Sequence, residues 1–232
     1  MPDLVLGLLW YVVLLFSLTF HEAAHAWAAL RGGDRTAYLG GQVSLDPLPH
    51  VRREPVGTVV APWLFYLLGG WMIGWASTPF DPVWAHAHPR RAAWMAVAGP
   101  AANLALVLAA ALAVRAGMAA GIFEAPASVG FSSLTAATAF GVWETVALLL
   151  SLLFTLNLLL FVFNLLPFPP LDGSSALGIV LSEEGARRIQ RLMAQPGPAL
   201  IGILMAWFLI GRVFRPIHLF AVNLLYPGMG YS

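Results

Sequence analysis

The sequence contains no cysteine and few charged residues. Without cysteine, the chain can form no disulfide, no thiolate metal site and no cysteine nucleophile. Any bound metal must therefore be held by histidine and carboxylate side chains. Charged residues make up only 10% of the 232 residues and hydrophobic residues 59%, whereas about a quarter of a soluble domain is charged. This composition predicts a polytopic membrane protein.

Lysine is also absent, so all twelve basic residues are arginine. Arginines suit the ends of membrane helices, but their presence does not indicate which molecule the protein binds. The formal net charge is +1, which argues against binding to nucleic acid. No polar stretch is long enough to build a second, soluble core.

Long apolar runs predict about four full transmembrane helices, and hence an all-α fold. The runs cover residues 4–30, 92–114 and 142–166 and a last span with its core at 198–210, and about 20 apolar residues cross a bilayer. The first run is too long for a signal peptide, so we expect it to remain as the first span. A short apolar segment follows at 216–226, and residues 42–45 predict a small β element after the first helix.

The first apolar run contains the motif His21-Glu22-Ala23-Ala24-His25. On a helix the two imidazoles lie one turn apart on one face, where both can ligate a single zinc ion. Glu22 then lies beside the metal, where its carboxylate can take a proton from water and return it to a leaving amine. Such ionisable groups are costly in a span unless they face a metal, a partner or a wet cavity. The alternative is a packed helix with a hydrogen-bonded histidine pair and a fortuitous glutamate.

A catalytic zinc site also needs a third protein ligand, for which we nominate Asp172. It is the only acidic residue that ends an apolar span beside a Pro/Gly break, in the stretch from Asn164 to Gly173. The alternative interpretation of Asp172 is a helix-ending turn, because Leu-Asp-Gly is favourable turn chemistry.

The position of Asp172 relative to the histidines constrains the topology. If residues 57–76 crossed the bilayer, Asp172 would emerge on the side opposite the histidines, about 30 Å of hydrocarbon away. We therefore expect a re-entrant apolar hairpin bent at Gly69-Gly70, which is tolerated where protein or a wet cavity surrounds it. By the positive-inside rule this topology places nine of the twelve arginines in the cytoplasm, at positions 31, 35, 52, 53, 90, 91, 187, 188 and 191.

Three stretches together resemble the site-2 protease family of intramembrane zinc metalloproteases. They are the motif at residues 21–25, the stretch Ala98-Gly99-Pro100-Ala101-Ala102-Asn103 and residues 164–173. The resemblance implies that His21, His25 and Asp172 hold one zinc ion and that Glu22 is the catalytic base. It implies regulated proteolysis of membrane-anchored, single-span proteins within the lipid bilayer, by an integral protein of a prokaryotic cell membrane whose active site faces the cytoplasm.

The same resemblance supplies further candidate residues and a domain organisation. Asn164 matches the family's asparagine ahead of Pro and Asp-Gly, where it would steady a substrate strand or an oxyanion. Asn103 and His50 are further candidates to contact the substrate, an oxyanion or the metal ligands. Residues 33–58 look like the compact subgroup without PDZ or CBS domains. We therefore expect one integral-membrane domain over 1–232, with a catalytic core at about 4–173 and C-terminal helices at 174–232.

A bound peptide is expected to add its extended backbone to an exposed strand within residues 41–45. Two alternative functions stay open. One is a transporter or channel-like protein whose His and Glu side chains bind an ion, although the sequence shows no internal repeats. The other is a membrane-bound zinc peptidase with other substrates, such as a prenyl-protein endoprotease, although Glu144 is the only other glutamate near a span.

Overall fold

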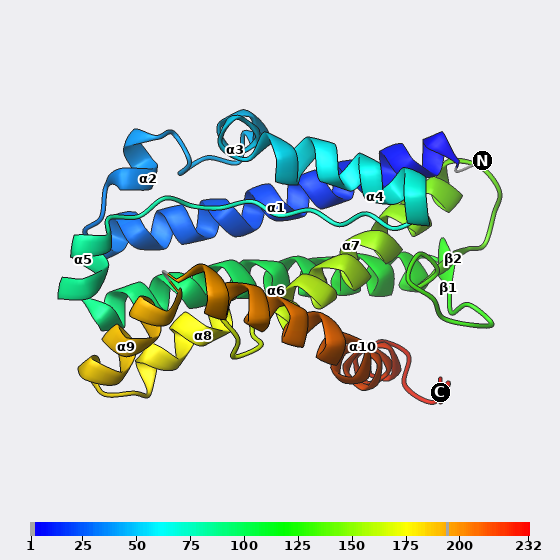
Figure 1. Cartoon of the computed structure of the whole chain (residues 1–232). Coiled ribbons are helices and arrows are strands. Elements are labelled where there is room, and N and C mark those ends of the chain that lie inside the picture. Colours follow the sequence, from blue (N-terminus) through cyan, green and yellow to red (C-terminus); the bar gives the residue numbers. More distant parts are fainter. Residues whose placement is uncertain (1–2, 194) are drawn as a thin grey trace.

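The structure is a computed structural model that describes residues 3–193 and 195–232, and its fold is a bundle of long helices (Figure 1). Within these residues, four helices are long and apolar enough to cross a membrane: α1 (Leu4–Gly32), α6 (Pro89–Ala119), α7 (Val142–Asn164) and α10 (Pro196–Leu225). This confirms the predicted all-α polytopic membrane protein.

The boundaries of α1 follow from local capping chemistry. The Asp3 carboxylate accepts hydrogen bonds from the backbone N–H groups of Val5 and Leu6 and so caps the start of the helix. Gly33, with a φ of 101°, ends the helix in the left-handed conformation that glycine adopts readily. Because no break occurs between these caps, residues 21–25 lie on an unbroken helix.

Helix α6 lies between the other helices and contacts α1, α7 and the short helix α8 (Asp172–Ala176). It is rich in alanine, and small residues allow membrane helices to approach closely. Ala110 and Val114 of α6 are fully buried in a cluster with residues of α7 and of the C-terminal part of α10. This packing joins α6, α7 and the C-terminal part of α10.

The segment between α1 and α6 folds back on itself. After α2 (Thr36–Leu39) and α3 (Pro47–Arg53), η1 (Val56–Val60) and α4 (Ala61–Gly69) run along α1. The chain then reverses at Gly70, which has a φ of 74°, and residues 71–81 return in an extended conformation to α5 (Pro82–Ala87) (Figure 1). A helical limb and an extended limb therefore form the predicted hairpin, with its bend at the predicted glycines. We call residues 71–81 the extended arm.

The predicted β element at residues 42–45 is wrong. The backbone N–H groups of Gly41 and Gln42 donate to carbonyls of α2, so these residues form the turn that ends that helix. Asp46 then caps α3, and Pro47 occupies its first turn. The structure instead contains two paired antiparallel strands, β1 (Phe123–Glu124) and β2 (Ala136–Ala137), in the connection between α6 and α7.

The predicted division of the C-terminal region into a span and a separate apolar tail is also wrong. Helix α10 continues through Pro216 as one element of 30 residues. It bends near its end, where Figure 1 shows its last turns along their axis. A proline removes one intrahelical hydrogen bond and bends a helix, but packing can keep both halves helical.

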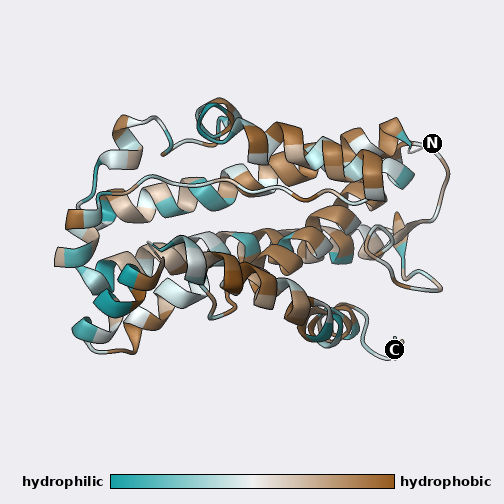
Figure 2. Ribbon diagram, viewed as in Figure 1, coloured by the Kyte–Doolittle hydropathy of each residue, from teal (hydrophilic) through white to brown (hydrophobic). Residues whose placement is uncertain are grey.

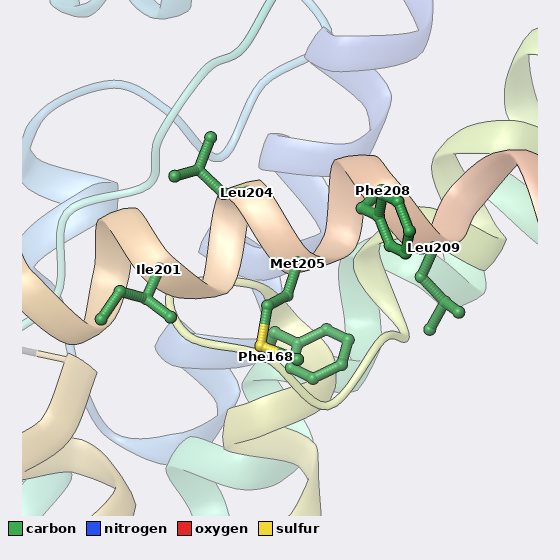
Figure 3. A pocket seen from close by; sticks show the side chains of 6 residues that line it. All are labelled: Phe168, Ile201, Leu204, Met205, Phe208 and Leu209. Carbon is green, nitrogen blue, oxygen red and sulfur yellow. The ribbon is translucent and has the colours of Figure 1, made fainter.

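Helix α10 also packs on the loop that precedes Asp172. A Cβ at Gly202 would lie only 1.8 Å from the carbonyl oxygen of Pro169, so only glycine permits this approach. Farther along, Phe168 and five side chains of α10 line an apolar groove of about 460 Å³: Ile201, Leu204, Met205, Phe208 and Leu209 (Figure 3). The C-terminal helix therefore supports the loop that leads to the predicted third ligand.

The two ends of the bundle differ in polarity. Helices α2, α5 and α9 (Glu183–Met193) lie at one end, and both termini and the two strands lie at the other (Figure 1). In Figure 2, hydrophilic residues are prominent in α9 and in part of α1, whereas α4 and α7 are largely hydrophobic. Arg187 and Gln190 of α9 donate to backbone carbonyls of α5 and thereby join the polar elements.

Candidate metal centre

The structure brings His21, His25 and Asp172 together. One ligating atom from each residue lies within 4.8 Å of the other two. The Nε2 atoms of the histidines are 2.9 Å apart, and Asp172 Oδ2 lies 3.1 Å from His21 Nε2 and 3.3 Å from His25 Nε2. Both histidines are only 5% exposed. Asp172 and a histidine 151 positions earlier in the sequence therefore belong to one cluster.

Each candidate ligand is presented by a rigid local structure. The histidines project from successive turns of α1, and Asp172 is the first residue of α8, directly after the Pro-rich loop. Gly173 permits this loop to fold tightly, because a Cβ there would lie 2.3 Å from the carbonyl oxygen of Leu165. The carboxylate is thereby fixed opposite the helix that carries the imidazoles.

The hydrogen-bond partners of the histidines leave their Nε2 lone pairs free. His25 Nδ1 lies 2.8 Å from the backbone carbonyl oxygen of Met95, which can only accept, so Nδ1 carries the proton of the neutral ring. His21 Nδ1 lies 2.5 Å from Asn103 Oδ1. Two nitrogen lone pairs and a carboxylate oxygen then converge, an arrangement that a cation stabilises.

The spacing of the three atoms fits zinc. Zn–N and Zn–O distances of about 2.0–2.2 Å in a tetrahedral site place ligand atoms about 3.3–3.6 Å apart. The observed separations of 2.9, 3.1 and 3.3 Å are close to these values. Two histidines and a carboxylate are also an established ligand set of catalytic zinc sites. The residues present therefore fit a catalytic zinc ion.

Gly99 of α6 lies directly against the two imidazoles of the cluster. A Cβ at this position would lie 2.3 Å from His25 Nε2 and 2.5 Å from His21 Nε2, so a side chain would collide with both ligating atoms. Gly99 of the Gly-Pro stretch is therefore needed for space at the candidate metal site. A glycine within a membrane span is typical of close helix approach, but the sequence does not show which group approaches it.

Glu22 lies beside the cluster and is contacted by the extended arm. The Thr78 hydroxyl is 2.7 Å from Glu22 Oε2 and 2.9 Å from the Glu22 backbone oxygen. Glu22 is 5% exposed, so this contact orients a buried carboxylate. Sequence reasoning missed Thr78, because nothing in the sequence relates a loop threonine to a helix 56 positions earlier.

The extended arm is fixed on both sides of Thr78. Ser77 donates to Glu54 Oε1, and its carbonyl accepts from the Gln42 side chain. The backbone N–H of Asp81 donates to Asp34. Burial raises the pKa of the Asp34 carboxyl, but hydrogen bonds from Thr36 and from the Asp81 N–H outweigh burial and hold the pKa below its ordinary value.

The remaining predicted site residues fall into two groups. Asn103 contacts His21, which makes it a direct neighbour of a candidate ligand. The Asn164 side chain donates to the Leu160 carbonyl of its own helix, and His50 Nε2 lies 3.0 Å from the Ser44 carbonyl oxygen. The structure therefore joins Asn103 to the cluster and shows no such contact for Asn164 or His50.

Comparison with known proteins identifies the family. The model of "Peptidase family M50" matches residues 9–209. The chain is 33% identical over 169 residues to "Putative zinc metalloprotease YwhC" of Bacillus subtilis, covering 70% of this chain and 64% of the relative. It is 34% identical over 178 residues to "Putative zinc metalloprotease Rip2" of Mycolicibacterium smegmatis, and 33% identical over 175 residues to the protein of that name from Mycobacterium tuberculosis.

Both Rip2 matches cover 75% of this chain and 58% of the relative, so the chain spans about three fifths of the length of these curated relatives. No solved structure matches the chain significantly. The family match covers α6 and α7 completely, α1 from residue 9 and α10 as far as residue 209, and it includes His21, His25 and Asp172. The chain belongs to peptidase family M50, the site-2 protease family.

Proposed function

We propose that this chain is a zinc metalloprotease that hydrolyses peptide bonds in or near the transmembrane segments of membrane-anchored proteins. The observation that carries the proposal is the convergence of two imidazole nitrogens and a carboxylate oxygen beside Glu22, within a helix long enough to span a membrane. His21, His25 and Asp172 would hold the zinc ion, and Glu22 would act as the base.

Zinc, when bound, polarises the scissile carbonyl and lowers the pKa of a water ligand to about 7. The chain's own residues supply the proton transfers. Glu22 accepts a proton as the water oxygen bonds to the carbonyl carbon, and then delivers that proton to the amide nitrogen as the C–N bond breaks. Thr78 holds one oxygen of the Glu22 carboxylate, and Asn103 holds the His21 ring.

The depth of the site supports a substrate that comes from the membrane. Seven helical residues separate His25 from the end of α1 at Gly32, which corresponds to about 10 Å at the usual rise per residue. The cluster would then lie below the lipid headgroups. A membrane-anchored segment reaches this depth laterally, and it must unwind locally because a helix keeps its carbonyls in internal hydrogen bonds.

The extended arm, and not residues 41–45, offers the extended backbone that a bound peptide requires. Its backbone is extended and half-exposed near Thr78, beside Glu22. An unwound substrate could pair with an edge of this kind, because strand addition binds a backbone without demanding one sequence. We assign the arm this role in place of residues 41–45, which form no strand.

The polar end of the bundle would face the cytoplasm of a prokaryotic cell. Arg31, Arg35, Arg90 and Arg91 and the three arginines of α9 belong to elements at this end. The positive-inside rule assigns arginine-rich connections to the cytoplasmic side. His21 and His25 are nearer to this end of α1 than to its N-terminus, so the active site would open towards the cytoplasm.

The test combines metal analysis with cleavage of a single-span reporter by purified protein in liposomes. Wild-type protein should contain about one zinc per chain and cut the reporter in or near its span. Glu22→Gln should retain zinc and lose cleavage, because an amide cannot accept the proton. Glu144→Gln, at the exposed start of α7, is the matched control and should behave as wild type.

Two results would overturn the proposal. If the wild-type protein bound no zinc, the ligand set would be wrong. If zinc were bound but cuts fell only in soluble tails, and helix-breaking residues placed in the reporter's span did not speed cleavage, the enzyme would be a membrane-bound peptidase of another kind.

A further inference from the structure

A hydrogen-bonded network of buried polar side chains connects three spans next to the candidate metal site. Ser17 of α1, Asn103 of α6 and Asn157 of α7 are each fully buried, with 0% exposure. Asn103 Nδ2 donates to Asn157 Oδ1 at 2.8 Å, and Asn157 Nδ2 donates to Ser17 Oγ at 2.9 Å. Polar groups are expensive inside a membrane protein and usually mark function.

The direction of every hydrogen bond in this network is fixed by backbone carbonyls, which can only accept. The Leu153 carbonyl lies 2.8 Å from Asn157 Nδ2, so the amide nitrogen must face it. The Ser17 hydroxyl gives its single proton to the Val13 carbonyl at 2.7 Å, so towards Asn157 it must act as an acceptor. The Asn157 oxygen therefore has to point at Asn103.

The same constraint passes on to the metal ligand. Because Asn157 offers an oxygen, Asn103 must turn its NH₂ group towards it, and the Asn103 oxygen then faces His21 Nδ1. An oxygen at that position requires the ring proton on Nδ1, which leaves Nε2 with a free lone pair. If the Asn103 amide were reversed, its NH₂ would face Nδ1, the proton would move to Nε2, and a metal could not bind there.

We infer that Asn157 and Ser17 are positioning residues that select the metal-binding tautomer of His21 through the amide of Asn103. His25 needs no such network, because the Met95 carbonyl fixes its tautomer directly. His21 is held by a side-chain amide, which can present either an oxygen or a nitrogen, so its tautomer depends on what holds that amide. The inference rests on the proposed zinc site but not on the proposed protease activity.

The test measures zinc affinity of purified full-length protein by competition with a chelator, together with the absorption spectrum after cobalt substitution. Asn157→Leu removes the oxygen that orients Asn103. It should weaken zinc binding by about 10- to 100-fold, which is the usual effect of removing a residue that orients a metal ligand through hydrogen bonds. Ser17→Ala should weaken it in the same direction. Asn157→Asp, whose buried carboxyl stays protonated and can donate its O–H to the Leu153 carbonyl, keeps an acceptor facing Asn103 and should bind zinc within a few-fold of wild type.

Thr155→Val is the matched control. Thr155 lies on the same helix, is 1% exposed, and its hydroxyl has no partner among the described residues, so its loss should leave zinc affinity unchanged. Thermal unfolding of the metal-free proteins measures any general loss of stability separately. Wild-type zinc affinity in Asn157→Leu, or equal losses in Asn157→Leu and Asn157→Asp, would overturn the inference. A wild-type protein without zinc would instead contradict the proposed function.

Discussion

Replacing Gly99 by alanine tests the geometry of the metal site with a single methyl group. The new Cβ would lie 2.3 Å from His25 Nε2 and 2.5 Å from His21 Nε2, whereas ordinary van der Waals contact begins near 3.4 Å. Even the shortest separation that real Cβ atoms show, 3.0 Å, would require His25 Nε2 to move by about 0.7 Å. Ligand distances in metal sites must stay within about 0.2 Å of their ideal values, so this displacement disrupts the site.

The expected effect on zinc is larger than the effect on folding. Removing a hydrogen-bond partner of a metal ligand lowers metal affinity about 10- to 100-fold. Displacing two ligands should therefore lower it more than about 100-fold. For folding, overpacking costs about 1–3 kcal/mol, and about 1 kcal/mol is regained because alanine favours a helix more than glycine does. The metal-free protein should therefore remain folded, with a stability loss of about 0–2 kcal/mol.

Zinc titration against a chelator and thermal unfolding of metal-free protein separate these two effects. Gly117→Ala is the matched control on the same helix, since its Cβ would lie 2.1 Å from Phe123 Cδ2, a similar collision far from the metal ligands. It should cost stability and leave zinc affinity unchanged. Wild-type zinc affinity in Gly99→Ala would refute the assignment of the cluster as the metal site.

Three further predictions concern the extended arm and the topology. Thr78→Val removes the hydroxyl that holds Glu22 and should lower kcat about tenfold or more with zinc content and KM unchanged, since a hydrogen bond to a charged group contributes about 1.5–3 kcal/mol. Thr78→Ser keeps the hydroxyl and should restore kcat. A wild-type kcat in the valine variant would count against this role. The pKa of Asp34 is lowered in the folded protein, so the stability that its carboxylate contributes is present above the unfolded pKa of about 4 and is lost as the pH falls. The difference in Tm between wild type and Asp34→Asn should therefore shrink between about pH 7 and pH 3. A constant difference would contradict this linkage. In intact cells, a cysteine introduced as Ala87→Cys should react only with reagents that enter the cytoplasm, and one introduced as Ser128→Cys should react from outside; the reverse pattern would show that the orientation is wrong.

The errors in the sequence-based interpretation have local causes. Residues 42–45 alternate in the manner of a strand, but hydrogen bonds to α2 and the Asp46 cap of α3 determine their conformation. The sequence predicted a separate apolar segment at residues 216–226, yet α10 continues through Pro216. In both places a pattern of a few residues competed with capping or packing, and the capping or packing prevailed.

The sequence by itself determined the class of protein and the chemistry of its centre. Composition and long apolar runs require a membrane protein, and the spacing of His21 and His25 places both on one helix face whatever surrounds them. The need to bring Asp172 to the same side of the bilayer also required residues 57–76 to turn back, as they do at Gly70. These conclusions follow from periodicity, from the thickness of a bilayer and from the ligand requirements of zinc.

Only the tertiary structure decided which groups surround that centre. The contacts of Thr78 with Glu22, of Gly99 with both imidazoles, and of Asn157 with Asn103 join residues separated by 54 or more positions. Such contacts depend on how α1, α6, α7 and the extended arm pack. The periodicity of one segment does not encode which neighbours another segment will bring. The contacts of Glu22 and of His21 are therefore visible only in the folded chain.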